Sequence, residues 1–171
     1  MVKGPFSQPV PPIAGDCLPE RFLPFSPKEE PERGMQLKQS IIELETTRRE
    51  ALYDITEQVR AKVEQSGINN GLVSIYAQGA TAAIMIQENW DESVQNDVVT
   101  LLRKLIPHGI WEHDQQDGNA DAHLKAGLVG PSETVPIIDG RLGLSTWQNI
   151  FFCEFDGPRK RRRVVVTIIG S

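Results

Sequence analysis

Short segments rich in apolar and β-branched residues recur along the chain after residue 35, a pattern typical of β-strands. Strands are predicted in QLKQSIIELE (36–45), GLVSIYA (71–77) and AAIMIQ (82–87). Further strands are expected where apolar runs are separated by turn signals such as DG and GP, in HLKAGLVG (123–130), ETVPII (133–138), RLGLSTWQ (141–148), IFFCEF (150–155) and RVVVTIIG (163–170). Strands therefore dominate the pattern.

Two segments have a helical period instead. DITEQVRAKVEQSG (54–67) opens with Asp54, an acidic residue suited to capping a helix, and ends at Gly67. A second helix is expected to begin at Asp91 and to stop before Pro107, with an apolar stripe along one side. The pattern predicts an α+β fold: a compact, sheet-rich single domain with two main helices over residues 35–171.

The first 34 residues differ in composition from the rest. Most of the 12 prolines fall in this proline-rich N-terminal extension, which has neither a helical nor a strand period. It also holds large apolar side chains: Phe6, Ile13, Leu18, Phe22, Leu23 and Phe25. Two interpretations stay open: the extension packs on the domain or on a neighbouring subunit, or it is a passive tail.

Charge and apolar content exclude several classes of protein. A net charge of −5 gives no electrostatic basis for binding nucleic acid. No apolar run approaches the roughly 20 residues of a membrane span, and the N-terminus lacks the apolar core of a secretory signal. The two cysteines, Cys17 and Cys153, lie far apart, which fits a reducing cytoplasm. We expect a cytoplasmic protein that binds neither membranes nor nucleic acid.

The basic run RKRRR (159–163) stands out against this acidic background. One interpretation is a charged edge that protects the following apolar strand, VVVTIIG, from aggregation. The other is a site for phosphate or another anion, because guanidinium groups bind phosphate with two parallel hydrogen bonds.

The segment DGNADAHLKA (117–126) gathers the most polar chemistry. If it is extended, Asp121 and His123 project to the same side and Lys125 continues that side. A carboxylate and an imidazole placed in this way can transfer protons, and Asp121 can equally hold a structural histidine. With His113, they also offer oxygen and nitrogen donors to a Zn²⁺-like ion. His108, after Pro107, is expected to interact with the dipole at a helix end.

Cys153 lies in NIFFCEF, where alternation places it on one face with Phe151 and Phe155. A buried, unreactive thiol is one interpretation, since cysteine is among the residues most often buried. A nucleophile is the other, and it would need nearby cations or a helix N-terminus to lower the pKa of the thiol.

Several of these motifs, in this order, resemble a known family. GLVSIYAQGATAAIMIQEN, DGNADAHLKAGLVGPSETVPIIDGRLGLSTWQ and the segment that follows are similar to the YjbQ-like proteins, also labelled secondary thiamine-phosphate synthases. The resemblance spans about residues 35–171. It implies a compact sheet-rich fold assembled as a homotrimer, with polar motifs near subunit interfaces and a weak thiamine-phosphate synthase activity.

The resemblance also implies site residues. The family's polar motifs fall on Glu88, Asn89, Asn119, Asp121, His123, Lys125, Trp147, Gln148, Cys153, Glu154 and Asp156. The chain departs from the family at Gln78-Gly79, where many relatives have a Pro-His pair, and at Ser145 and Asn149, where glycines are usual. Either the site uses fewer imidazoles than the family pattern implies, or it differs in its task.

Thiamine-phosphate synthesis joins hydroxymethylpyrimidine pyrophosphate to thiazole phosphate and releases pyrophosphate. In this interpretation Lys125 and the arginines bind phosphate, Asp121 or Glu88 holds Mg²⁺, and His123 transfers a proton, with Cys153 as a third catalytic candidate. The remaining motif residues, Asn89, Asn119, Trp147, Gln148 and Glu154, would bind the ligand. A non-catalytic ligand-binding or assembly protein, with its polar site at the trimer interface, stays open as the alternative.

Overall fold

The computed structural model describes residues 34–171, which form one compact unit. In chain order its elements are β1 (Gln36–Thr46), β2 (Ala51–Asp54), α1 (Thr56–Ser66), β3 (Gly71–Ala77), β4 (Ala82–Gln87), α2 (Glu92–Leu105), the 3₁₀ turn η1 (Glu112–Gln115), α3 (Ala120–Val129), β5 (Ser132–Ile138), β6 (Arg141–Leu142), β7 (Asn149–Glu154) and β8 (Arg159–Gly170). The interpretations of the proline-rich extension concern residues outside this described part.

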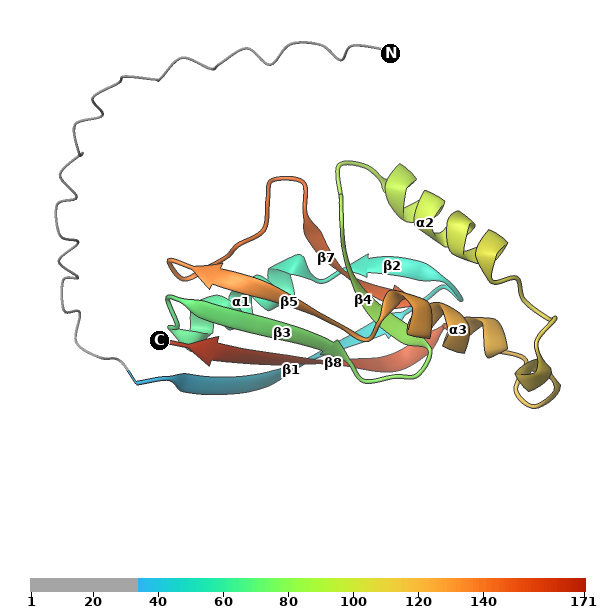
Figure 1. The fold of residues 1–171 in the computed structure, drawn as a ribbon, viewed down its shortest axis with the longest axis horizontal. Helices are drawn as coiled ribbons and strands as arrows, with labels where there is room; N and C mark the ends of the chain where they lie inside the picture. Colours follow the sequence, from blue (N-terminus) through green and yellow to red (C-terminus); the bar gives the residue numbers. More distant parts are fainter. Residues whose placement is uncertain (1–33) are drawn as a thin grey trace, which may run out of the picture. The chain divides into compact units, whose positions relative to one another are not determined.

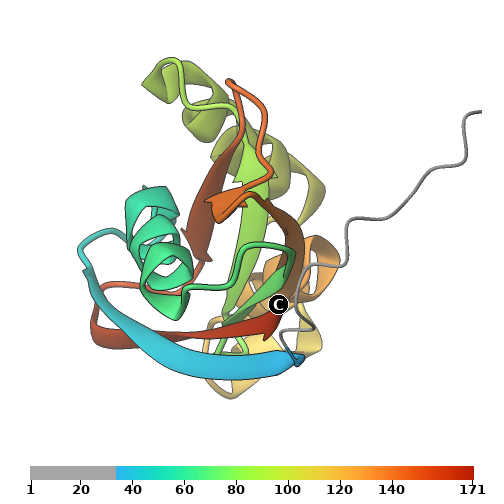
Figure 2. The ribbon, with the colours of Figure 1, turned by 90° about the vertical axis from the view of Figure 1, so that its left-hand side faces the viewer.

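The strands form two antiparallel sheets, shown in Figure 1. The larger sheet has the order β1-β8-β3-β5-β6, and the smaller one has the order β2-β7-β4. Viewed from one end, the sheets curl around a shared interior with α1 along one side (Figure 2). The α+β, sheet-rich fold expected from the sequence is confirmed.

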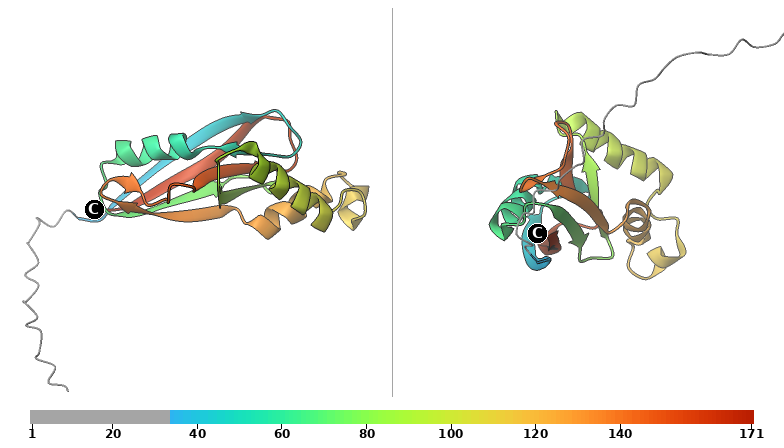
Figure 3. Two further views of the ribbon diagram at one scale, coloured as in Figure 1. Left: turned by 90° about the horizontal axis from the view of Figure 1, so that it is seen from above. Right: turned by 60° about the vertical axis from the view of Figure 1, so that its left-hand side comes forward.

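The main core lies between the two sheets and α1. It holds Val59 of α1, Val73 of β3, Ile84 of β4 and Val166 of β8, all at most 1% exposed. A second apolar cluster covers the other face of the smaller sheet, where Leu102 of α2 and Ala83, Ala122, Ala126, Cys153 and Phe155 meet. The smaller sheet is therefore buried on both faces, and α2 and α3 lie together at one end of the folded part, away from α1 (Figure 3).

The predicted helix ends match the structure closely. Gly67, at a left-handed φ of 68°, ends α1, and Asp91 caps α2 by accepting a hydrogen bond from the Ser93 amide at 2.7 Å. Asp54 also stabilises the start of α1: its Oδ1 accepts hydrogen bonds from the Thr56 amide and hydroxyl at 2.8 and 2.6 Å. The residue at the N-cap position itself is Ile55, one residue later than expected.

The expected strand over 123–130 and the extended conformation of 117–126 are wrong. Residues Ala120–Val129 form a helix, so the folded part has three α-helices instead of two. Ala122 and Ala126, four residues apart, pack against the smaller sheet, and Asp121 and Lys125 form an ion pair at the same spacing. The small side chains of Ala122 and Ala126 let α3 approach the sheet closely. Contacts at a spacing of four residues therefore outweigh the period-two alternation that suggested a strand.

Two smaller differences follow from local hydrogen bonds and pairing. RLGLSTWQ is a strand only at Arg141–Leu142, because Ser145 and Gln148 close a turn through hydrogen bonds of 3.0 and 3.1 Å. The basic run 159–163 starts β8, which lies between β1 and β3, but the run itself pairs only with β1 because the pairing with β3 ends at Val164. Within residues 34–171, no helix is long and apolar enough to cross a membrane.

Candidate functional site

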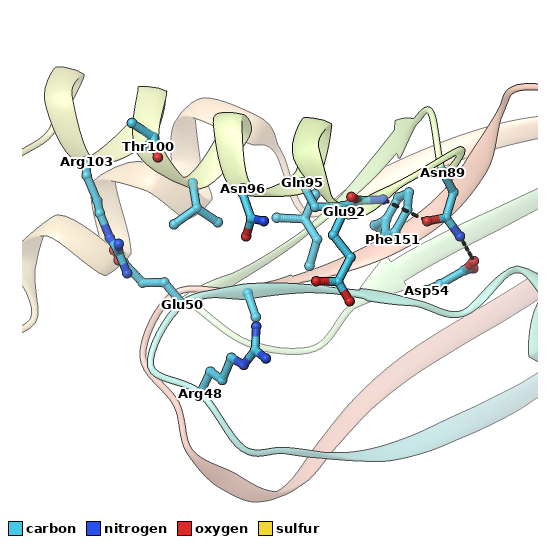
Figure 4. A pocket seen from close by; sticks show the side chains of 13 residues that line it. Arg48, Glu50, Asp54, Asn89, Glu92, Gln95, Asn96, Thr100, Arg103 and Phe151 are labelled. Atoms are coloured by element: carbon cyan, nitrogen blue, oxygen red, sulfur yellow. Dashed lines mark hydrogen bonds and ion pairs between the residues drawn. The ribbon is translucent and has the colours of Figure 1, made fainter.

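A cleft of about 420 Å³ opens between β2 and α2, a size typical of small-molecule sites. Figure 4 shows its polar side chains, which come from the β1–β2 loop, β2, the β4–α2 loop and α2. The cleft is lined by Arg48, Glu50, Ala51, Leu52, Asp54, Asn89, Glu92, Gln95, Asn96, Val99, Thr100, Arg103 and Phe151. Of the predicted site residues, only Asn89 is in this set.

One end of the cleft carries positive charge. The Arg103 guanidinium is paired with Glu50, whose side chain is 6% exposed. Arg48 reaches into the cleft from the opposite wall (Figure 4), and no acidic side chain of residues 34–171 pairs with it. The end near Arg48 and Arg103 can therefore accept an anionic group such as a phosphate.

The other end of the cleft is acidic. Both carboxylate oxygens of Asp54 are already hydrogen-bonded. Oδ2 accepts hydrogen bonds from Asn89 at 2.7 Å and from Asn149 at 2.8 Å, and Oδ1 accepts them from Thr56. Glu92 has no hydrogen-bond or ion-pair partner for its carboxylate among the described residues. The cleft thus has a cationic end and an acidic end, and the acidic end includes the free carboxylate of Glu92.

Behind the cationic end lies a buried ion cluster. Lys125 Nζ donates to Glu50 Oε1 at 2.5 Å and to Asp121 Oδ2 at 2.7 Å, and the Lys125 and Asp121 side chains are 2% and 1% exposed. Asp121 Oδ1 also contacts Arg49 Nη2 at 3.2 Å and His108 Nδ1 at 3.1 Å. The cluster holds the β1–β2 loop, which carries Arg48 and Glu50, against α3.

Asp121 is ionised by this environment. Burial raises the pKa of Asp121, but the hydrogen bonds from Lys125 and His108, with the charges of Lys125 and Arg49, outweigh burial and hold the pKa below its usual value. A carboxylate fixed by three donors is a poor proton acceptor near neutral pH. Asp121 therefore acts in positioning the loop.

The expected pairing of Asp121 with His123 does not occur. On a helix, residues two apart face different ways, so Asp121 points inward to Lys125 while His123 lies half-buried on the other side of α3. The His123 ring packs edge-on against His113 with centroids 5.3 Å apart, in a second hollow of about 470 Å³ lined also by Trp111, Ala120 and Leu124. His108 contacts Asp121, where we expected an interaction with the helix end.

A group that could hold a metal ion differs from the predicted one. His108, Asp114 and Asp121 each place one donor atom within 4.8 Å of the others. The Asp114 carboxylate already accepts hydrogen bonds from the Trp111 and Ala120 amides, and Asp121 is neutralised by Lys125 and Arg49. Two fixed cations beside the carboxylate oppose a further divalent charge, so these residues fit a metal ion poorly.

Comparison with known proteins identifies the family. A model described as UPF0047 protein YjbQ-like matches residues 40–171. The chain belongs to this YjbQ-like family. The UPF0047 protein of Methanocaldococcus jannaschii is 46% identical over 129 residues, 75% of this chain and 92% of that protein, and YugU of Bacillus subtilis is 42% identical over 123 residues, 70% and 91% of the two chains.

A solved structure confirms the fold. A YbjQ-like protein of unknown function from Sulfolobus solfataricus superposes with a TM-score of 0.78 at 39% identity, covering 81% of this chain and all of the other. These relatives are named for their family and not for a reaction. Membership in the YjbQ-like family therefore confirms the fold, and the chemistry has to be argued from the side chains.

Several residues taken over from the YjbQ-like pattern hold the fold together. Glu154 is fully buried and accepts hydrogen bonds from Thr46, from the Asp156 amide and, through both oxygens, from Arg162. Asn119 Nδ2 donates to Asp156 at 3.1 Å. These contacts join β7 and β8 to the start of α3, so Glu154 and Asn119 both have partners within the fold.

The four arginines of the basic run also pair with carboxylates. Arg162 pairs with Glu154, Arg159 with Asp156, and Arg161 and Arg163 with Glu43 of β1. The arginines that would form an anion site thus have carboxylate partners within β1, β7 and the turn after β7. This arrangement favours a structural role for residues 159–163.

Cys153 is buried at 0% exposure in the cluster between β7, α2 and α3. Burial raises the pKa of the Cys153 thiol to about 12. A thiol that does not ionise is a weak nucleophile, which favours the packing interpretation.

The other motif residues of the YjbQ-like pattern lie near the acidic end of the cleft. Glu88 Oε1 accepts a hydrogen bond from the Trp90 amide at 3.2 Å, and Trp90 packs against Trp147. Gln148 closes the turn that carries Trp147. Gln78 and Gly79, which replace the family's Pro-His pair, lie in the turn between β3 and β4.

Sequence reasoning missed the residues that line the cleft, chiefly Arg48, Glu50, Glu92 and Arg103. They come from a loop and a helix about 40 residues apart, and each looks like an ordinary surface charge in sequence. One available signal was TTRRE (46–50), a charged run directly between two strands.

Proposed function

We propose that this chain is a transferase of the thiamine-phosphate synthase type, and that the cleft between β2 and α2 binds its phosphorylated substrate. The observation that carries the proposal is Arg48, a cation in a cleft of ligand size without an acidic partner among residues 34–171. The resemblance of the chain to secondary thiamine-phosphate synthases supplies the reaction. A cytoplasmic location belongs to the same proposal.

The reaction suits a cleft of this kind. The bond between the pyrimidine methylene carbon and the pyrophosphate oxygen breaks, pyrophosphate leaves with the electron pair, and the thiazole nitrogen forms the new carbon–nitrogen bond. The attacking nitrogen carries no proton, so no base has to remove one. The protein must stabilise the negative charge of the leaving group and align two rings.

Each end of the cleft has a part in this scheme. Arg48 and Arg103 would bind the pyrophosphate oxygens, and Glu50 holds Arg103 in place. Glu92, whose carboxylate is free of partners among the described residues, would be a ligand for Mg²⁺, an ion that neutralises pyrophosphate charge when bound. The buried cluster of Lys125, Asp121 and Glu50 would keep the β1–β2 loop, which carries Arg48, rigid.

A specific observation also supports the alternative function, a non-catalytic binding or assembly protein. The same observation supports a homotrimer, which we propose for either function. On the outer face of the larger sheet, Leu37, Ile169 and Leu72 lie in register on neighbouring strands and are 62%, 41% and 48% exposed. Ile41 and Tyr76 add a second exposed apolar row. A contiguous apolar face suits contact with another copy of the chain.

The test compares product formation and pyrophosphate binding in the full-length protein. A phosphate contact of an arginine contributes about 1.5–3 kcal/mol, so Arg48→Ala should lower both by roughly 10- to 100-fold. Arg60→Ala is the matched control, because Arg60 is exposed on α1 and pairs only with Glu57 in the described part. Unchanged activity in Arg48→Ala would refute the proposal, and binding by the wild type without product would favour the non-catalytic alternative.

A further inference from the structure

Two tryptophans stand exposed at the acidic end of the cleft. Trp90, in the β4–α2 loop, and Trp147, in the β6–β7 loop, are 73% and 54% exposed. Their ring centroids are 5.2 Å apart at an interplanar angle of 69°. Exposed tryptophan is costly in water, so a pair of such rings needs an explanation beyond folding.

The pair is held in place by one carboxylate. Asp54 Oδ2 accepts hydrogen bonds from Asn89, the residue before Trp90, and from Asn149, two residues after Trp147. Asp54 Oδ1 is in turn fixed by Thr56 at the start of α1. Asp54 thus ties both tryptophan-bearing loops to a rigid element.

Each loop has a further constraint of its own. The Trp90 amide donates to Glu88 Oε1, and the turn 145–148 is closed at both ends by Gln148. The rings therefore stand on preorganised backbone, which lowers the entropy lost when a ligand binds them.

We infer that Trp90 and Trp147 form a binding site for a flat, nitrogen-containing aromatic ring whose phosphorylated arm reaches the arginine end of the cleft. This inference rests on the proposed function and adds the subsite that would hold the ring. The steep angle between the two rings forms a corner, in which a flat ring can stack on one indole and meet the other with its edge. Asp54 and Asn89 belong both to this corner and to the cleft lining, so a single ligand spans the two.

The ring is expected to contain nitrogen because the tryptophan faces favour a positively charged ligand. A ring with partial or full positive charge is attracted to the face of tryptophan, the aromatic side chain that binds cations best. The carboxylate of Glu88, which accepts a hydrogen bond from the Trp90 amide, reinforces this preference for positive charge. A neutral sugar or aliphatic chain carries no positive charge and would gain no cation–π attraction.

The test uses tryptophan fluorescence in full-length protein with Trp111→Phe, which leaves Trp90 and Trp147 as its only two tryptophans. Thiamine and thiamine phosphate should quench the emission, and ribose 5-phosphate, which has no aromatic ring, should not. Since stacking on an aromatic side chain changes affinity by roughly 5- to 150-fold, Trp90→Leu and Trp147→Leu should raise the Kd for thiamine phosphate by that factor. The Kd for inorganic pyrophosphate should stay within about twofold, and Trp147→Phe should bind nearly as well as the parent.

The outcomes separate this inference from the proposed function. Loss of oligomer in sedimentation, with Kd for thiamine phosphate unchanged in the leucine variants, would make the pair a subunit contact and overturn the inference. Wild-type protein that binds pyrophosphate but no ring compound would overturn the inference alone. Ring binding that depends on both tryptophans, without any product formed, would support the inference and overturn the proposed transferase.

Discussion

Lys125 Nζ lies 2.7 Å from Asp121 Oδ2, one helical turn away on the buried side of α3. The same ammonium group donates to Glu50 of the β1–β2 loop at 2.5 Å. Because Glu50 also pairs with Arg103 of α2, one buried lysine links α3, the loop and α2. The geometry of the cleft therefore depends on a buried lysine that is not part of the cleft lining.

Replacing Asp121 with asparagine should destabilise the protein by about 3–5 kcal/mol at pH 7, since Lys125 loses a buried counter-charge. The folded-state pKa of Asp121 lies below 3.8, so its ionisation stabilises the fold above that pH and the contribution disappears as pH falls through the folded-state pKa. Urea unfolding from pH 7 down to pH 3 measures this. The difference between wild type and Asp121→Asn should be constant above about pH 5 and shrink below pH 4; a difference that does not vary with pH would refute the assignment.

A double-mutant cycle tests the coupling of the pair itself. Lys125→Met leaves the Asp121 and Glu50 carboxylates buried without their shared cation and should cost about 3–5 kcal/mol. Lys125→Met combined with Asp121→Leu should cost less than the sum of the two single changes, by at least about 1 kcal/mol. Additive costs would mean that the two side chains act independently.

Cys153 should be unreactive in the native protein. With a thiol pKa of about 12, only roughly one molecule in ten thousand is a thiolate at pH 8. In a Cys17→Ser background, iodoacetamide should leave native Cys153 unlabelled for hours and should label it after denaturation. Cys153→Ala should keep product formation within about twofold and lose about 1 kcal/mol of stability. Rapid labelling of folded protein, or loss of activity in a stable Cys153→Ala variant, would restore the thiol as a nucleophile.

Local sequence patterns predicted most of the fold correctly. The apolar segments at residues 71–77 and 82–87 and the caps at Gly67 and Asp91 depend on local chemistry, and the structure has these elements where they were expected. Residues 120–129 were harder, because apolar residues at 120, 122, 124, 126 and 128 follow a period of two, as in a strand. The spacing of Asp121 and Lys125, four residues apart, was the signal for a helix there.

The site was less predictable for a physical reason. The sequence pointed to Asp121 and Lys125, but whether a charged side chain faces solvent or another charge depends on which loop packs against it. Glu50 and Arg103 are 53 residues apart and meet only through the tertiary fold. No local sequence pattern predicts such a pair. The cleft can therefore be recognised only when the positions of β2 and α2 in the fold are known.

Variants of His123 and Arg48 distinguish two hypotheses about the place of the reaction: the histidine hollow and the cleft. The sequence pointed to His123, which lies with His113 in the second hollow, on the opposite side of α3 from Lys125 and Asp121. If the cleft carries the reaction, Arg48→Ala should lower product formation at least tenfold, and His123→Ala should keep it within about threefold. Both side chains are at least partly exposed, so melting temperatures of the two variants should stay within a few degrees of wild type. Product formation and melting temperature are measured for both variants at the same pH and Mg²⁺ concentration. A folded His123→Ala protein without activity, beside an active Arg48→Ala protein, would move the reaction to the histidine hollow.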